Sequence, residues 1–313
     1  MNPSTPSGRQ VTATEFEYEE LHVPVAGGRL TALRWPAEQP HAPVVLALHG
    51  ITANALSWAR VAHHLRGRVT LVAPDLRGRA GSNGVAGPYG IGAHVDDVVA
   101  LLDELGLDRV VVAGHSMGAF VSALAAARHR DRISSLVLVD GGLGFPAPPG
   151  LDGDELITAV IGPAMRRLSM TFPDREAYRA FWQAHPAFGA AWSPWADDYI
   201  QRDLVGEEPG LRSSCRVDAV RIDSVQLFQA EVLGAIRALD CPAELLWAER
   251  GLMDEPQGLY DERRLAAADL PGAGVVPIRV AGTNHYTILL ADPGARIVAQ
   301  RIEAAAGVAS TDH

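Results

Sequence analysis

The sequence Gly-His-Ser-Met-Gly at residues 114–118 is the strongest chemical signal in the chain. It follows an apolar run, Val110 to Ala113, and opens a stretch with helical periodicity at Met117. Glycines on both sides allow a sharp strand-to-helix turn that presents the Ser116 hydroxyl above a sheet, beside a helix N-terminus that stabilises negative charge. We therefore predict that Ser116 is a nucleophile for acyl transfer.

A serine nucleophile needs a base, and the base comes from elsewhere in the fold. His285 is the candidate, because it lies in Gly-Thr-Asn-His-Tyr at 282–286, just past the last predicted strand; only His313 follows it. Other histidines are better explained as surface or ordinary hydrogen-bonded side chains than as the base: His22, His41, His63, His64, His94, His129 and His185.

The elements around these residues predict an α/β fold. Short apolar runs rich in Val and Leu, bounded by Gly, Pro or Asp, indicate strands buried on both faces of a parallel sheet. Segments with helical spacing separate them, which is typical of a doubly wound sheet. The expected strands are 44–48, 69–73, 110–113, 136–139, 243–247 and 275–280, after a hairpin at 16–35; the expected helices are 57–65, 91–105, 117–129, 261–268 and 293–306.

The strand rhythm stops between Gly141 and Ile236, which predicts an insertion into one sheet. The expected organisation is a disordered tail at 1–14, a core at 15–144 and 237–307, a helical cap at 145–236, and a second tail at 308–313. Eight aromatic residues lie between Phe172 and Tyr199. A cap lined by rings excludes water and buries hydrocarbon, so we expect substrate contacts from Phe181, Trp182, Trp192 and Trp195.

Taken together, these motifs resemble the α/β-hydrolase fold family over Phe16 to Ala306. The family fold is a mostly parallel sheet of about eight strands, here with an inserted helical cap. His-Gly-Ile-Thr at 49–52 resembles the family's oxyanion turn, and Asp-Leu-Arg-Gly at 75–78 another common turn. The resemblance implies that the backbone N–H groups of Met117 and Ile51 hold the oxyanion of a tetrahedral intermediate.

The third member of the expected triad is an acid. In relatives, the acid lies at a typical distance before a helix start, which the stretch 261–265 resembles, and this distance points to Asp254. The typical distance after the preceding strand, counted from Trp247, instead reaches Gly251, which has no acidic side chain. A short loop insertion reconciles the two counts. Asp140, after the strand at 136–139, is the alternative because some relatives take their acid from there; Glu249 and Glu255 are weaker candidates.

The nucleophile narrows the function. Haloalkane dehalogenases and epoxide hydrolases of this fold attack with aspartate, so Ser116 disfavours both. The predicted function is hydrolysis of carboxylic esters or lactones of an apolar or aromatic small molecule through an acyl-enzyme. A C–C bond hydrolase, a perhydrolase and an acyltransferase have the same triad, and a non-catalytic small-molecule receptor has the same fold.

Composition excludes several other classes. The formal net charge of −10 disfavours binding to nucleic acid and to anionic membranes, because both are negatively charged. All 27 basic residues are arginine, which removes Schiff-base and P-loop lysine chemistry. Cys215 and Cys241 do not form a zinc or disulfide framework and are expected to be free thiols. We expect no metal, no cofactor and a cytoplasmic location, while the oligomeric state stays open.

Overall fold

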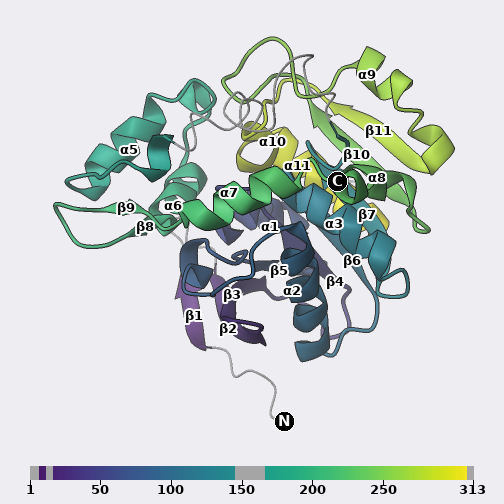
Figure 1. Cartoon of the computed structure of the whole chain (residues 1–313), viewed down its shortest axis with the longest axis horizontal. Coiled ribbons are helices and arrows are strands. Elements are labelled where there is room, and N and C mark those ends of the chain that lie inside the picture. Colours follow the sequence, from purple (N-terminus) through teal and green to yellow (C-terminus); the bar gives the residue numbers. More distant parts are fainter. Residues whose placement is uncertain (1–6, 12–16, 145–165, 309–313) are drawn as a thin grey trace.

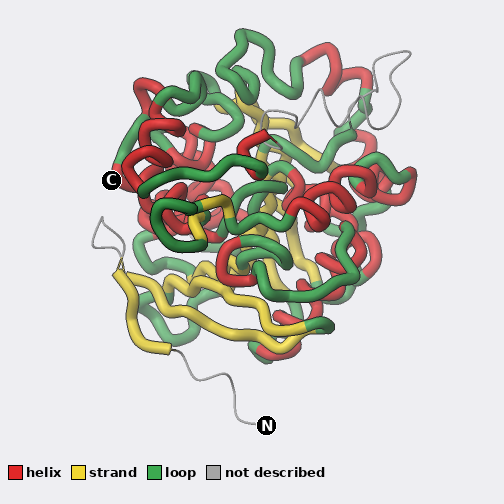
Figure 2. Tube along the Cα trace, turned by 60° about the vertical axis from the view of Figure 1, so that its left-hand side comes forward, coloured by secondary structure: helices red, strands yellow, loops and turns green. Residues whose placement is uncertain are grey.

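The protein is built around one nine-stranded sheet, described here from a computed structural model that covers residues 7–11, 17–144 and 166–308. The strand order is β1-β2-β3-β5-β4-β6-β7-β10-β11. From β5 to β11 the strands are parallel, while β1, β2 and β3 are antiparallel. The antiparallel strands form the yellow ribbon at the lower left of Figure 2. The strands are β1 (Ser7–Val11), β2 (Glu17–Val25), β3 (Gly28–Trp35), β4 (Val44–Leu48), β5 (Thr70–Pro74), β6 (Val110–His115), β7 (Ile133–Val139), β10 (Ala243–Ala248) and β11 (Val275–Val280).

The parallel strands are continuous apolar runs because helices cover both faces of the sheet. Successive side chains of a strand point to opposite faces, and each face is part of a separate hydrophobic core. In β6, for example, Val111 belongs to the core that includes α1 and α11, whereas Val112 belongs to the core that includes α2 and α3. The core helices are α1 (Ala59–Leu65), α2 (Ile91–Glu104), α3 (Met117–Arg128), α9 (Glu262–Ala267), α10 (Thr287–Leu290) and α11 (Gly294–Ala305).

Between β7 and β10 the chain leaves the sheet and forms an inserted segment. We call its described part, residues 166–236, the cap. Figure 1 shows α5 and α6 grouped with the β8–β9 hairpin on one side, with α7 lying across the molecule. Its elements are α5 (Arg175–Gln183), α6 (Pro194–Arg202), β8 (Leu204–Val205), β9 (Arg212–Ser213), α7 (Val217–Gln226) and α8 (Ala230–Gly234).

The predicted mostly parallel sheet with helices on both faces is confirmed, and the expected strands and helices lie within a few residues of the observed ones. Strand β1 differs from prediction, since it falls in the segment 1–14 that was expected to be a disordered tail. Its sequence has little apolar character, but its backbone pairs with the outer edge of β2. The rest of that tail, the cap residues 145–165 and residues 309–313 lie outside the described part.

The structure also bears on the two cysteines and on membrane-spanning helices. Cys215 and Cys241 are free, with Cys215 buried and Cys241 partly buried. In the described part of the chain, no helix combines the length and the apolar character needed to cross a membrane.

Candidate active site

Ser116 occupies the sharp turn between β6 and α3, as its motif predicts. Its backbone has φ 53° and ψ −122°, a region that costs a non-glycine residue about 1–3 kcal/mol. Space explains the glycines on either side. A Cβ on Gly114 would lie 2.3 Å from the Gly118 carbonyl oxygen, and one on Gly118 would lie 2.2 Å from the Leu48 carbonyl oxygen. Helix α3 therefore packs directly onto the ends of β4 and β6.

His285 lies in the loop after β11, and its Nδ1 forms a 2.6 Å hydrogen bond with Asp140 Oδ2. The Asp140 side chain is fully buried at the end of β7, and its Oδ1 accepts a bond from the Ala248 amide at 3.0 Å. Because Asp140 accepts from Nδ1–H, the tautomer leaves Nε2 as the basic nitrogen. This pair has the geometry of an acid that orients a general base.

Ser116 and His285 line the same cavity, of about 900 Å³. No hydrogen bond joins their side chains among the described residues. The His285 loop is held by His115, the residue before the serine, whose Nε2 bonds the His285 carbonyl at 2.9 Å and whose ring lies 4.6 Å from the His285 ring. Burial and the neighbouring His285 hold the pKa of His115 well below its usual value, so its ring is neutral. His115 therefore connects the loop of His285 to the turn of Ser116.

The two expected oxyanion donors also border this cavity. Met117 is the first residue of α3, where backbone N–H groups have no partner within the helix. Ile51 follows β4 and lines the cavity beside Gly50. Gly50 lies so close to the serine that a Cβ built on it would be 3.6 Å from Ser116 Oγ. The structure thus brings the segment 49–52 against the serine turn.

Asp254, the preferred acid of the sequence analysis, does not contact His285. Its Oδ1 accepts from Arg250 Nε at 2.8 Å and from Asn284 Nδ2 at 3.0 Å. Its side chain is 35% exposed, whereas that of Asp140 is 0% exposed. The geometry therefore reverses the order of the two candidate acids. The physical reason is that β7 and β10 are neighbours in the sheet, so the loops after both strands reach the His285 region, and counting along one loop cannot tell which carboxylate arrives.

The aromatic predictions divide in two. Phe181 and Trp182 line the cavity, while Trp192 and Trp195 are not among its described lining residues. Trp192 packs on Phe188, with ring centroids 6.2 Å apart, and Trp195 packs on His63 of α1 at 5.2 Å. Both tryptophans belong to the core of the cap and to its contact with the sheet domain.

Other lining residues are not among the predicted substrate contacts. Tyr286 and Phe120 lie beside the two predicted motifs, since Tyr286 follows His285 and Phe120 is in the first turns of α3. Leu227, Phe228 and Leu233 come from the end of α7 and from α8, where only the tertiary packing reveals them. The cavity wall is therefore mainly apolar.

Two arginines of the cap also line the cavity. Arg166 is exposed, whereas Arg167 is 2% exposed and pairs with Asp203 of the cap, which also accepts a 2.5 Å bond from Tyr178 Oη. The Arg167 guanidinium lies 5.1 Å from the centre of the Trp182 ring. The Arg167 side chain thus lies at the wall of the cavity with its charge balanced by Asp203.

Comparisons with known proteins show which proteins are similar to this chain. The N-formylmaleamate deformylase of Pseudomonas putida is 32% identical over 259 residues, which cover 77% of this chain and 85% of that protein. The lipase LipV of Mycobacterium tuberculosis is 44% identical over 96 residues. That match and those to three further mycobacterial proteins span only about a third of those relatives' length.

A solved structure supports the same fold. The E-2-(acetamidomethylene)succinate hydrolase superposes with a TM-score of 0.72 at 22% identity, covering 92% of this chain and 98% of that one. In addition, the family model described as the alpha/beta hydrolase fold matches residues 43–175. With a relative above 30% identity aligned over most of its length, the chain belongs to the α/β-hydrolase fold family.

Proposed function

We propose that this protein is a serine hydrolase that cleaves a carboxylic ester or lactone of an apolar or aromatic small molecule. The observation that carries the proposal is the hydrogen bond from His285 Nδ1 to the buried Asp140, at the wall of the cavity that Ser116 also lines. A buried carboxylate on Nδ1 fixes the imidazole tautomer and stabilises the imidazolium that forms during proton transfer.

In the proposed reaction, Ser116 Oγ attacks the carbonyl carbon of the substrate while His285 Nε2 takes the hydroxyl proton. The amides of Ile51 and Met117 donate hydrogen bonds to the oxyanion of the tetrahedral intermediate. Collapse of the intermediate expels the alcohol, which receives the proton from His285 and leaves an acyl ester on Ser116. Water then attacks this ester, His285 takes the water proton, and the carboxylic acid departs as Ser116 regains its proton.

The cavity wall supports an apolar acyl or alcohol group. Phe120, Phe181 and Trp182 line it together with aliphatic side chains of the cap. Burial of a substrate's hydrocarbon against such a wall favours binding by about 25 cal/mol per Å² of apolar surface. Substrates with a short to medium hydrocarbon chain therefore fit this reading.

A second candidate is hydrolysis of an amide in a substrate that bears a carboxylate. The exposed Arg166 at the cavity favours it, because guanidinium groups pair with carboxylates. Two relatives, N-formylmaleamate deformylase and 2-(acetamidomethylene)succinate hydrolase, are named for substrates of this kind. Both candidates use the same serine, histidine and aspartate.

The test is a kinetic panel with the wild type and Ser116→Ala. The panel pairs p-nitrophenyl esters of neutral acyl chains with esters of the same length that end in a carboxylate. We expect the wild type to turn over at least one set and Ser116→Ala to lose at least about 10⁴-fold in kcat. A higher kcat/KM for the carboxylate esters would favour a substrate that bears a carboxylate, as the second candidate requires. Turnover at the wild-type rate in Ser116→Ala, or ligand-induced thermal stabilisation without any turnover in the wild type, would overturn the proposal.

A further inference from the structure

The peptide bond between Gly50 and Ile51 carries one of the proposed oxyanion donors, and buried groups hold it from its carbonyl side. His49 Nε2 accepts a bond from the Leu76 amide at 2.9 Å, so its Nδ1 carries the proton and donates to the Gly50 carbonyl at 2.7 Å. The carbonyl of Gly50 and the N–H of Ile51 belong to one planar trans unit and point in opposite directions. Fixing the carbonyl therefore aims the N–H.

The next carbonyl along the chain is held by an arginine. Arg79 Nε donates to the Ile51 carbonyl at 2.9 Å, and its Nη1 donates to the Arg77 carbonyl at 2.7 Å. The Arg79 side chain is 0% exposed. The Ile51 residue is thus fixed on both sides, by His49 before it and by Arg79 after it.

The charge of Arg79 is balanced from the cap. Its Nη2 lies 2.6 Å from Oδ2 of Asp223, a fully buried residue of α7. The carboxylate also accepts bonds from the Gly90 amide at 2.8 Å and from His94 Nε2 at 3.0 Å. Burial alone would raise the pKa of Asp223, but Arg79 and His94 outweigh burial and hold that pKa below its usual range. A charged pair therefore crosses the boundary between cap and core.

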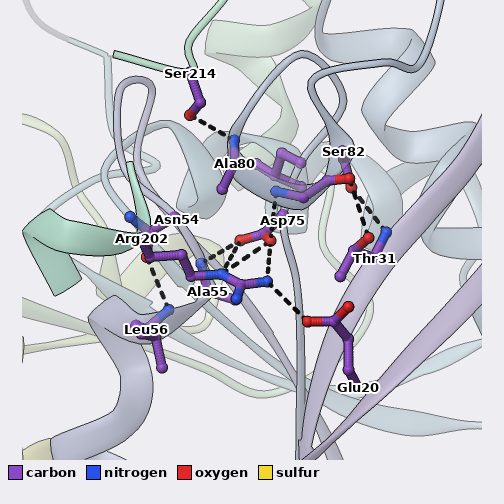
Figure 3. Close-up of polar contacts among 12 residues, drawn as sticks. Glu20, Thr31, Asn54, Ala55, Leu56, Asp75, Ala80, Ser82, Arg202 and Ser214 are labelled. Carbon is purple, nitrogen blue, oxygen red and sulfur yellow. Dashed lines mark hydrogen bonds and ion pairs between the residues drawn. The ribbon is translucent and has the colours of Figure 1, made fainter. Parts of the chain in front are cut away.

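A second set of bonds attaches the same two core segments to the cap, as Figure 3 shows. Arg202 of α6 bonds the buried Asp75 through Nη2 at 2.5 Å, and Asp75 Oδ1 in turn accepts from the Ala55 amide at 2.8 Å. The Ala80 amide donates to Ser214 Oγ of the cap at 2.8 Å. The segment that follows β5 is therefore bonded directly to cap residues, and Asp75 links it to the segment that follows β4.

We infer that Arg79 is a positioning residue for the oxyanion-binding amide of Ile51, and that Asp223 of the cap keeps it in place. Docking of the cap and stabilisation of the transition state are then coupled through one buried ion pair. The inference rests on the proposed function, since it assigns a role within the same acyl-transfer site. Removing an oxyanion donor costs about 10²–10³-fold in kcat, so misaligning one should cost about tenfold or more.

The chain offers a matched control. Arg77 and Asp97 form a second buried ion pair, with Nη2 and Oδ1 2.5 Å apart and side chains 1% and 3% exposed. The other bonds of the Arg77 guanidinium go to the carbonyls of Ala26, Ala86 and Pro88, none of which belongs to the oxyanion turn. Asp97→Asn therefore weakens a buried pair of the same kind whose side chains bond neither Ile51 nor Arg79; Arg77 contacts Arg79 only through its backbone carbonyl.

The experiment compares wild type, Asp223→Asn, Arg79→Lys and Asp97→Asn with an ester substrate and with a trifluoromethyl ketone, which forms a tetrahedral adduct on serine. We expect Asp223→Asn and Arg79→Lys to lower kcat about tenfold or more, with KM changed less than about twofold, and to weaken ketone inhibition by the same factor as kcat. Asp97→Asn should lower thermal stability but leave kcat and ketone inhibition close to wild type. Arg79→Lys keeps the charge, so it tests the geometry of the Nε bond even where Asp223→Asn folds poorly.

The outcomes separate this inference from the proposal beneath it. Wild-type esterase activity with unchanged kcat and unchanged ketone inhibition in folded Arg79→Lys and Asp223→Asn would overturn the inference alone. An equal loss of kcat in Asp97→Asn would also overturn it, because the effect would then be general destabilisation. A wild-type protein with no hydrolytic activity and no ketone adduct would overturn the proposed function and the inference together.

Discussion

At the scale of single residues, the decisive contact is between Asp140 and His285. Asp140 has φ 44°, outside the regions a non-glycine residue prefers, and its amide donates to the Leu246 carbonyl at 2.7 Å. The strained turn directs the carboxylate from the end of β7 to His285 Nδ1. Asp254 instead accepts a hydrogen bond from the side chain of Asn284, which also donates to the Ala187 carbonyl of the cap at 3.0 Å. Its contacts are those of a residue that braces the loop beside His285.

The residue-scale prediction compares the two acids. Asp140→Asn should lower kcat for ester cleavage by about 10⁴-fold, because an amide at this position favours the wrong imidazole tautomer. Asp254→Asn should change kcat by less than about tenfold, since the asparagine keeps a side-chain oxygen for Arg250 and Asn284. Steady-state kinetics on both variants, with circular dichroism as a check on folding, decide the matter. The reverse order of effects would show that the loop after β10 supplies the acid.

The sequence points to the candidate nucleophile and the candidate base more clearly than to the candidate acid, for a physical reason. Ser116 is set by a local turn whose glycines and flanking strand and helix are all visible along the chain. His285 follows the last strand with no competing histidine in the same loop. The acid depends on which of two adjacent loops bends toward the imidazole, and that depends on tertiary packing that neither loop's sequence records.

At the scale of elements, the contact between α3 and β4 determines how the serine is presented. Helix α3 approaches the Leu48 carbonyl so closely that only glycine fits at position 118. We expect Gly118→Ala to lower the free energy of unfolding by about 1–3 kcal/mol or more, because the helix must move away from the sheet. Urea denaturation measures this change.

The control for that variant is a glycine in α2. A Cβ on Gly92 would meet only the tip of Arg128 at 3.4 Å, so Gly92→Ala should raise the free energy of unfolding by up to about 1 kcal/mol through helix propensity. Stability equal to wild type in Gly118→Ala would show that the close approach of α3 and β4 is not required.

Most elements of the core are predictable because each parallel strand is a short apolar run bounded by Gly, Pro or Asp. Strand β1 is not, since its residues carry no apolar pattern and its pairing depends on the open edge of β2. The roles of Trp192 and Trp195 are also hidden. An aromatic residue in a cap packs inward or lines the cavity according to how the cap helices sit on the core, and composition does not determine this.

At the scale of the whole molecule, buried neutral histidines make stability depend on pH. His49 is fully buried, and burial lowers its pKa from 6.5 to about 4. In the unfolded chain this histidine binds a proton below about pH 6.5, whereas the folded protein does not until about pH 4. The unfolded state therefore binds more protons between these values, and the free energy of unfolding falls as the pH falls through this window.

The corresponding variant is His49→Asn, whose amide can still donate to the Gly50 carbonyl but does not titrate. The full pKa difference at His49 corresponds to about 3 kcal/mol. Between pH 7.5 and 4.5, urea denaturation should show a loss of stability that is about 2–3 kcal/mol smaller in His49→Asn than in wild type. An identical loss in both proteins would mean that His49 does not contribute to the acid sensitivity.

If Ser116 is the nucleophile that carries the acyl group, a fluorophosphonate should modify it, and peptide mapping by mass spectrometry locates the modified residue. We expect a single phosphonyl adduct, on the peptide that contains Ser116, formed rapidly in wild type, far more slowly in Asp140→Asn and not at all in Ser116→Ala. An adduct on a different serine, or an unmodified Ser116 in a protein that still cleaves esters, would contradict it.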